Sequence, residues 1–313
     1  GKGVVSNHLT FASLGTLMGS LYFEKYYGEK LAEPKEWLEI VRHNFYRQID
    51  SAKAHDDCNG YQWLTWHHLL LYTTAMPDNR FLTNGYADKV MRGMLLTMDN
   101  LGYQVPYGDT GSWKCWFSEI ICLNIFYAAT GDPLAAYILG WKRKLNDQKS
   151  PGMFYANLPA QAPEPAGFNG VQVFALDPAY YQTSHGEGAV LPLDKCFDKL
   201  SMREALNPAA LYLLVDGVNN GGHKHADANS VLRHTQFDRI WLADNDYFKS
   251  QQKFHNTLLL VADGEAFALP DYIELLGKGD EKEYGWSSTR ANNLGAASWT
   301  RHLIWLKPEK AYV

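Results

Sequence analysis

Side chains able to bind a metal ion or transfer a proton are densest around residues 223–227, where His223, His225 and Asp227 alternate with other residues. In an extended strand, alternate side chains share one face, so we expect these three to point the same way. Two imidazoles and one carboxylate are good ligands for zinc. A hydrogen-bonded polar network without a metal ion is the alternative interpretation of the same pattern.

Further metal-binding side chains follow at Asp244, Asp246 and His255. One metal ion could be held by His225, Asp244 and His255 if neighbouring strands supply them, and Asp246 is the alternative carboxylate. Other zinc enzymes also carry a His-x-His-x-Asp pattern. The metallo-β-lactamase type needs a histidine directly after the aspartate, where this chain has Ala228. The amidohydrolase type needs a barrel of alternating strands and helices, and this sequence shows no such alternation.

The elements that must position these residues change in type along the 313-residue chain. Apolar residues recur at helical spacing through the first 150 residues, and short β-type runs between turn residues follow from residue 211. No helical pattern alternates with these runs, which favours an antiparallel sandwich over a parallel sheet. The expected helices are 8–27, 34–45, 62–74, 81–98, 113–130 and 133–145, and the expected strands are 211–216, 230–234, 239–243, 257–262 and 302–306.

These patterns predict an α+β multidomain protein with a helical domain over residues 1–150, a linker over 151–170 and a β-sandwich over 171–313. Proline, alanine and glycine are frequent in the central segment, as is typical of a domain boundary. Six helices with short connections suggest three antiparallel pairs. Pairs of this kind stack into bundles, solenoids or toroids.

Composition limits the classes of partner. Hydrophobic residues make up 46% of the chain, which is enough to bury real cores, and the formal net charge is −5. Nucleic acid usually requires a basic face, whereas an acidic glycan needs only a local basic cleft. No apolar run reaches the roughly 18 residues that span a bilayer. Cys58, Cys115, Cys122 and Cys196 form no Cys-x-x-Cys pair, which favours free thiols over a disulfide, although spacing alone leaves both open.

Residues 197–264 resemble the C-terminal sandwich of the heparinase II/III-like polysaccharide lyases. The resemblance implies an (α/α) toroid, incomplete within this chain, packed against an antiparallel β-sandwich. It also implies a structural zinc ion bound by His225, Asp244 and His255. The residues that carry it are Phe197-Asp198-Lys199, Arg203, the segments 212–217 and 222–230, Leu242-Ala243-Asp244 with Tyr247, and the segment 254–258.

The same resemblance assigns catalytic candidates. Asn7-His8 is similar to the Asn-His pair that opens a catalytic helix in these lyases, and His223 is similar to a histidine that faces the substrate. The family places a catalytic tyrosine some fifty residues after the asparagine, and Tyr61 lies 54 positions after Asn7. Tyr107 is the alternative tyrosine.

The implied reaction is β-elimination, which removes the proton on C5 of a uronate and expels the oxygen on C4. The α-proton of a carboxylate is very weakly acidic, so the enzyme must neutralise that group or donate hydrogen bonds to it. Asn7, with His8 or His223, could do this. Tyr61 could protonate the leaving oxygen, and the base is either the same tyrosine or one of the two histidines.

The implied substrate is an acidic, uronic-acid-containing polysaccharide or oligosaccharide, and the product carries a 4,5-unsaturated uronate end. Tyr107, His67 and Arg203 are the expected substrate-binding residues. We expect the enzyme to be secreted or periplasmic, with its signal peptide outside this chain.

Two other classes of function stay open at this point. A glycoside hydrolase would need two carboxylates across a cleft, and Asp56, Asp57 and Asp109 are available in the helical half. A non-catalytic glycan-binding protein would need none of the catalytic candidates.

Overall fold

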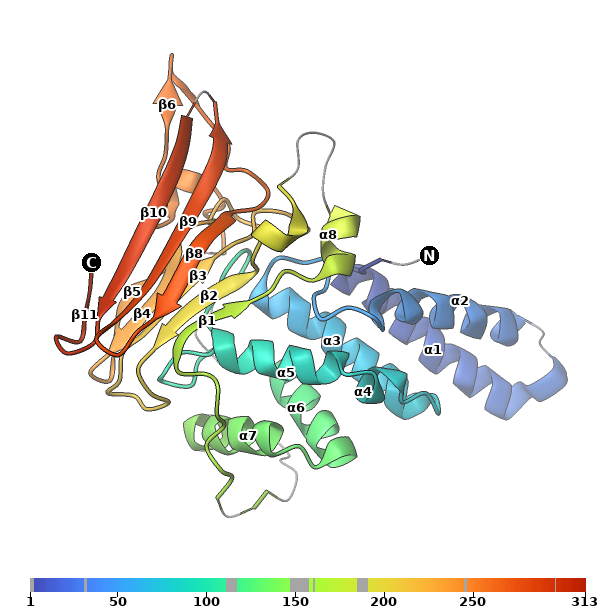
Figure 1. Ribbon diagram of the computed structural model, residues 1–313. Helices are drawn as coiled ribbons and strands as arrows, with labels where there is room; N and C mark the ends of the chain where they lie inside the picture. Colours follow the sequence, from blue (N-terminus) through green and yellow to red (C-terminus); the bar gives the residue numbers. More distant parts are fainter. Residues whose placement is uncertain are drawn as a thin grey trace.

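Helices and strands occupy opposite sides of the molecule (Figure 1). This computed structural model describes residues 3–30, 33–110, 117–146, 158–159, 161–184, 191–244, 247–295 and 297–313. Within these ranges the helices of the N-terminal side are α1 (Asn7–Tyr27), α2 (Glu33–Gln48), α3 (Asn59–Ala75), α4 (Arg80–Thr83), α5 (Tyr86–Thr97), α6 (Phe117–Thr130) and α7 (Pro133–Asn146).

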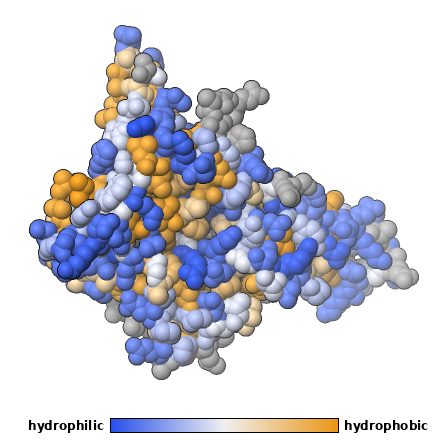
Figure 2. Space-filling view, in the orientation of Figure 1, coloured by the Kyte–Doolittle hydropathy of each residue, from blue (hydrophilic) through white to orange (hydrophobic). Residues whose placement is uncertain are grey.

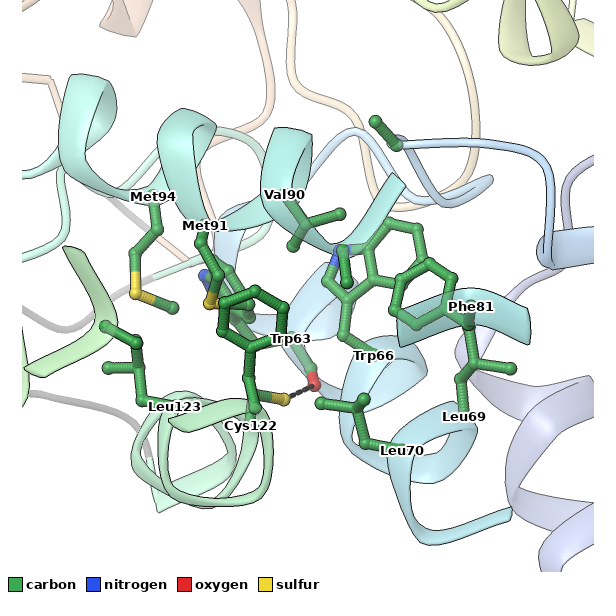
Figure 3. Packing of buried hydrophobic residues seen from close by; sticks show 14 of the residues in the cluster. Trp63, Trp66, Leu69, Leu70, Phe81, Val90, Met91, Met94, Cys122 and Leu123 are labelled. Carbon is green, nitrogen blue, oxygen red and sulfur yellow. Dashed lines mark hydrogen bonds between the residues drawn. The ribbon is translucent and has the colours of Figure 1, made fainter. Parts of the chain in front are cut away.

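The helices pack around one apolar core. Helix α1 contacts α2 and α3, α3 contacts α6, and α6 contacts α7. Figure 3 shows Trp63 and Trp66 of α3 beside Phe81 of α4, Val90 of α5 and Cys122 of α6. Residues three or four positions apart share one face of a helix. The core residues of α3, which begin at Trp63, therefore form one apolar stripe toward its neighbours. The first turn of α3 precedes this stripe.

The expected helix over residues 81–98 is wrong in one respect, because the structure divides it into α4 and α5. Gly85 lies between them with a φ of 86°. Glycine adopts this left-handed conformation without steric cost, and the chain turns there. Residues 111–116, which include the start of the helix expected over 113–130 and Cys115, lie outside the described residues.

Two antiparallel sheets form the other side of the molecule. The described strands pair in the order β1-β2-β3-β4-β5 in one sheet and β11-β10-β9-β8 in the other. Apolar side chains from both sheets, including Leu200, Val215, Leu303 and Trp305, share one core. The predicted α+β fold with an antiparallel sandwich is thus confirmed. The strands are β1 (Gly170–Phe174), β2 (Lys199–Arg203), β3 (Tyr212–Asp216), β4 (Val231–Gln236), β5 (Arg239–Ala243), β8 (Glu274–Asp280), β9 (Tyr284–Leu294), β10 (Ala297–Leu306) and β11 (Ala311–Tyr312).

Strand prediction fails at residues 257–262, where only β6 (Val261–Ala262) is a strand, paired with β7 (Glu265–Ala266) across a tight turn. Helix α8 (Pro178–Ser184) and the short 3-10 helices η1 (Gly28–Lys30), η2 (Leu193–Lys195) and η3 (Gln252–Phe254) complete the described elements. Of the linker expected over 151–170, residues 151–157 and 160 lie outside the described residues. Figure 2 shows hydrophobic residues gathered mainly along the strands, while hydrophilic residues cover most of α1 and α2.

Strands β2 and β3 of the five-stranded sheet are buried on both faces. In β2, Leu200 and Met202 enter the sandwich core, whereas the alternate residue Arg203 lies among residues of the helical side. The Arg203 guanidinium donates hydrogen bonds to the carbonyls of Leu95 and Met98 at the end of α5. Its side chain is fully buried. The expectation that Arg203 binds substrate is therefore wrong, and this residue joins the sheet to the helices.

A cluster of buried charges, which we call the junction cluster, lies where the helices meet this sheet. It consists of Lys53, Asp57, Asp198, Lys199 and Asp216. The Lys53 ammonium lies 3.0 Å from Asp57 and 2.9 Å from Asp198, and the Lys199 ammonium lies 2.9 Å from Asp198 and 2.9 Å from Asp216. Buried charges are tolerated when they are paired in this way.

Two further observations concern the whole described chain. Among the residues that the structure describes, no helix combines the length and the apolar character that crossing a membrane requires. Cys58, Cys122 and Cys196 are buried and free of disulfide bonds.

Candidate active site

The N-terminus of α1 is held by two hydrogen-bond acceptors. Ser6 is the N-cap, and its hydroxyl accepts from the backbone N–H of Leu9 at 3.5 Å. An Asp56 carboxylate oxygen accepts from the backbone N–H of Asn7 at 2.9 Å. A negative charge at the N-terminus of a helix also interacts favourably with the helix dipole. The first turn of α1, with Asn7 buried and His8 exposed, is thereby fixed against the segment that precedes α3.

The first turn of α3 carries Tyr61. Its backbone is fixed from the side, because the Thr110 hydroxyl accepts from the N–H of Gly60 at 3.1 Å. The Tyr61 ring stacks on the His223 ring with 3.9 Å between the centroids and 19° between the planes. Its hydroxyl lies 2.5 Å from the hydroxyl of Tyr247. The phenol and the imidazole are therefore side by side.

Residues 217–230 form the loop between β3 and β4, so the prediction that His223, His225 and Asp227 share one face of a strand is wrong. His223 has a φ of 56°, which is uncommon for a non-glycine residue. This left-handed residue turns the chain so that the three side chains diverge. His223 lies near the rings of Tyr61 and His8, the latter with a centroid distance of 5.9 Å.

The other two side chains of this loop enter the interior. The His225 ring lies 5.5 Å from the His255 ring, and an Asp227 carboxylate oxygen accepts from the backbone N–H of Gly108 at 3.0 Å. Burial and the nearby Asp57 charge raise the pKa of Asp227 to about 6. The loop between β3 and β4 thus offers His223 to the site and uses His225 and Asp227 for internal contacts.

Two carboxylates flank His223, and the sequence did not assign them to it. Nδ1 of His223 lies 3.0 Å from an Asp109 oxygen, and Nε2 lies 3.9 Å from an Asp56 oxygen. The His223 and Asp109 side chains are 23% and 21% exposed, whereas Asp56 is 1% exposed. No local signal in the sequence pairs Asp109 with His223, which lies 114 positions later in the chain.

The protonation state of Tyr61 follows from its surroundings. Burial of the hydroxyl, and then the hydrogen bond with Tyr247, raise the pKa of Tyr61 above its usual value. The charge of Asp109 adds to this effect. The phenol therefore keeps its proton at neutral pH.

The asparagine of the site has hydrogen-bonding capacity that the described residues do not use. The Oδ1 atom of Asn7 is buried and has no hydrogen-bond partner among them. Buried amide groups normally find partners, and functional sites are a recognised place for exceptions. The unpaired atom is an acceptor, so it can take a hydrogen bond from a donor but cannot bind a carboxylate. Asn7 precedes His8, whose ring lies 5.9 Å from that of His223.

Two of the expected substrate-binding residues lie in different surroundings. His67 is half-buried on α3, and its Nδ1 lies 3.3 Å from the Ser118 hydroxyl of α6, so its role stays a prediction. Tyr107 is only 4% exposed, and the Lys199 ammonium lies 4.0 Å from the centre of its ring. A substrate does not reach a ring in this position, so the expected role of Tyr107 is wrong and the ring belongs with the junction cluster.

The three expected zinc ligands lie near one another. Nδ1 of His255 is 2.7 Å from an Asp244 oxygen, and the second Asp244 oxygen accepts from the N–H of Asn256 at 3.1 Å. Burial lowers the pKa of His255, but the Asp244 hydrogen bond and charge raise it overall. Asp246 lies outside the described residues. No group of three or more His, Cys, Asp or Glu side chains in the described ranges is arranged as a metal site, and zinc stays a prediction.

Comparisons with known proteins concern the fold. No protein-family model and no curated protein matches the sequence. A crystal structure of heparinase III matches with a TM-score of 0.65 and 12% identity, covering 96% of this chain and 45% of that protein. Heparan sulfate lyase HepC from Pedobacter heparinus matches with a TM-score of 0.60 and 10% identity, covering 98% and 45%. The chain therefore spans less than half the length of these proteins and has the fold of the corresponding part of heparinase III.

Proposed function

We propose that this chain belongs to a polysaccharide lyase that cleaves a uronic-acid-containing glycan by β-elimination. The observation that carries the proposal is the stacked pair of Tyr61 and His223, with the His8 ring of the first turn of α1 close to His223. Proteins of the same fold act on heparan sulfate, so a glycosaminoglycan of this type is the first substrate to test. The product would carry a 4,5-unsaturated uronate at its new end.

The reaction needs a group that binds the uronate carboxylate. Removing the C5 proton places negative charge on that carboxylate, so hydrogen bonds that strengthen in the transition state accelerate the step. The Asn7 amide can donate such a bond through Nδ2. His8, exposed at the same helix end, can add a second donor or serve as an alternative base.

The acid and the base are assigned from protonation. A tyrosine phenol is protonated at neutral pH, and the surroundings of Tyr61 raise its pKa further. We assign Tyr61 the protonation of the leaving oxygen on C4. His223 is partly exposed and stacked against Tyr61, and we assign it the removal of the C5 proton. Both groups then act on neighbouring carbons of one sugar.

A glycoside hydrolase is less well supported. It would need two accessible carboxylates about 5–9.5 Å apart across the scissile bond. Asp56 and Asp57 are each only 1% exposed, and both are engaged, by the N–H of Asn7 and by Lys53 respectively. Asp109 alone of the three is accessible, and it lies against His223.

The test is an ultraviolet absorbance assay of the intact protein on a panel of uronic-acid polymers, because the new double bond absorbs and a hydrolysis product does not. Tyr61→Phe should lower kcat by roughly 10²–10⁴-fold, as expected for loss of a general acid. Tyr284→Phe, an exposed tyrosine of β9, is the matched control. Loss of absorbance in both variants, or in neither, argues against the assignment of Tyr61.

We also propose a structural zinc ion held by His225, Asp244 and His255. The donor types suit zinc, and Nε2 of His255 is buried without a hydrogen bond among the described residues. Bound zinc would hold the loop between β3 and β4 against the segment after β5. Elemental analysis should find one zinc per chain, lost in His255→Ala together with a lower melting temperature. The exposed His43→Ala is the control, and an unchanged melting temperature without bound metal would remove zinc from the account.

An enzyme with a polymeric acidic substrate needs to meet it outside the cytoplasm. We therefore propose secretion or periplasmic location, and cell fractionation of the source organism tests it. Recovery of the protein with cytoplasmic markers would reject this location.

A further inference from the structure

We propose that Asp109 is a positioning residue, which fixes both the tilt and the tautomer of the His223 imidazole for proton abstraction. The proposal rests on the lyase function given above. Asp109 was considered from the sequence only as a possible hydrolase carboxylate. Its contacts assign it a different role, which acts through His223 rather than on the sugar.

Asp109 contacts His223 twice. A carboxylate oxygen lies 3.0 Å from Nδ1 of the imidazole, and the backbone N–H of Asp109 donates to the backbone carbonyl of His223 at 2.8 Å. The side chain and the main chain of His223 are therefore held by the same residue. A residue with a φ of 56° needs such surrounding contacts, because the conformation costs free energy by itself.

The side-chain contact determines which nitrogen can accept a proton. A carboxylate only accepts hydrogen bonds, so Nδ1 of His223 carries the hydrogen that it donates to Asp109. In the neutral ring Nε2 then holds the free electron pair. The Asp56 oxygen is 3.9 Å from Nε2, too far for a hydrogen bond, so Nε2 stays available. After Nε2 takes up the C5 proton, both carboxylates face an imidazolium and stabilise it.

The loop that carries Asp109 is held rigidly. Gly108 has a φ of 58°, and a Cβ atom there would lie 2.2 Å from the Asp57 carbonyl oxygen and 2.7 Å from that of His223. The N–H of Gly108 donates to Asp227, and the Thr110 hydroxyl accepts from Gly60. Only glycine allows the main chain to approach this closely. The Asp109 carboxylate is thus placed by the close approach of Gly108 to neighbouring main chain and by the hydrogen bonds of Gly108 and Thr110.

The second oxygen of Asp109 extends the arrangement inward. It lies 3.7 Å from Nε2 of the buried His225. One carboxylate therefore lies between the imidazole that faces the site and the imidazole of the internal histidine pair. The 3.7 Å distance is too long for a hydrogen bond, so the contact of Asp109 with His225 is one of charge only.

The experiment compares Asp109→Asn and Asp109→Glu with wild type, in activity assays and by nitrogen-15 NMR of histidine-labelled, ligand-free protein. Asp88→Asn, an exposed carboxylate of α5, is the matched control. The His223 signals are assigned with His223→Gln. Wild-type His223 should be the tautomer with hydrogen on Nδ1. Asp109→Asn should lose this preference and lower kcat by roughly 10–100-fold with little change in KM, as for other residues that orient a functional imidazole. Asp109→Glu should recover part of both.

The two readouts separate failure of this proposal from failure of the lyase function. Hydrogen on Nε2 in the wild type, or an unchanged tautomer in Asp109→Asn, overturns the positioning role whatever the activity. A change in KM alone, or a fall in kcat explained by a lower melting temperature, also overturns it. A wild-type protein that cleaves no uronate polymer by elimination rejects the lyase function, while the tautomer in the same sample still decides whether Asp109 positions His223.

Discussion

Two polar clusters lie side by side where the helices meet the five-stranded sheet, and the consecutive residues Asp56 and Asp57 belong to different ones. Asp57 is part of the junction cluster, paired with Lys53. Asp56 belongs to the site cluster, which we define as Asn7, Tyr61, Asp109 and His223 with Asp56 behind them. The junction cluster is buried throughout, whereas His223 and Asp109 are 23% and 21% exposed.

The difference shows how similar residue types serve stability in one place and chemistry in the other. In the junction cluster each ammonium is surrounded by carboxylates, and Lys199 keeps its proton because Asp198 and Asp216 outweigh burial, so its pKa is raised. In the site cluster Nε2 of His223, 3.9 Å from Asp56, retains capacity for a ligand. Burial within a network of ion pairs withholds a group from reaction, whereas a group at a partly open surface stays available to a ligand.

The largest expected effect on folding comes from breaking the junction cluster. Lys199→Met leaves Asp198 and Asp216 without one of their cations in a buried setting, so the free energy of unfolding should fall by about 3–5 kcal/mol. Urea unfolding followed by circular dichroism measures it. Lys282→Met is the control, because Lys282 is 94% exposed and its loss should change little. Equal effects of the two substitutions would show that the junction cluster contributes no more than surface charges.

The next effect tests how the two clusters are held together. Gly108→Ala places a methyl group against the carbonyls of Asp57 and His223, so it should lower the free energy of unfolding by about 1–3 kcal/mol and reduce kcat by displacing His223. Gly131→Ala is the matched control, since Gly131 also has a positive φ but nothing within 4 Å of the added carbon. Similar losses in both variants would attribute the whole effect to backbone conformation and none to the contact.

A smaller effect concerns a third kind of polar residue, buried without a charged partner. Nδ1 of His68 lies 2.9 Å from the Thr10 hydroxyl, and burial, with a contribution from His67, lowers the pKa of His68 to about 4. The unfolded chain takes up a proton near the ordinary value of about 6.5 while the folded ring stays neutral, so the free energy of unfolding falls as the pH drops from there toward 4.

His68→Gln should make this acid-dependent loss less steep, by at most one proton. Urea unfolding between about pH 7 and about pH 4.5 measures the slope, and the exposed His302→Gln is the control. A slope that is unchanged in His68→Gln and reduced in His302→Gln would reverse the assignment.

Sequence patterns predicted the sandwich where local rules are sufficient. The strand expected over 239–243 coincides with β5 (Arg239–Ala243), and the one expected over 211–216 nearly coincides with β3 (Tyr212–Asp216). The sequence patterns missed β2 (Lys199–Arg203), because its alternating basic and apolar residues indicate a strand with one face in solvent. Its charged residues are buried instead, since the helical side supplies the Asp57 carboxylate to Lys199 and backbone carbonyls to Arg203.

The site was predictable only in part for the same reason. Asn7, His8, Tyr61 and His223 were named from a resemblance, and the structure brings the rings of His8, Tyr61 and His223 together. Asp109 lies 114 positions from His223 in the chain, and no local pattern connects two residues across that distance. Tyr107 and Arg203 were misassigned because their burial depends on how the helices meet the sheet.

The most direct test of elimination is the mass of the fragments released from a defined uronate oligosaccharide by the intact protein. Elimination predicts that the two fragments together have the mass of the substrate, and that the one bearing the new end carries a C4–C5 double bond. Fragments whose summed mass exceeds the substrate by one water would show hydrolysis and would contradict the central claim.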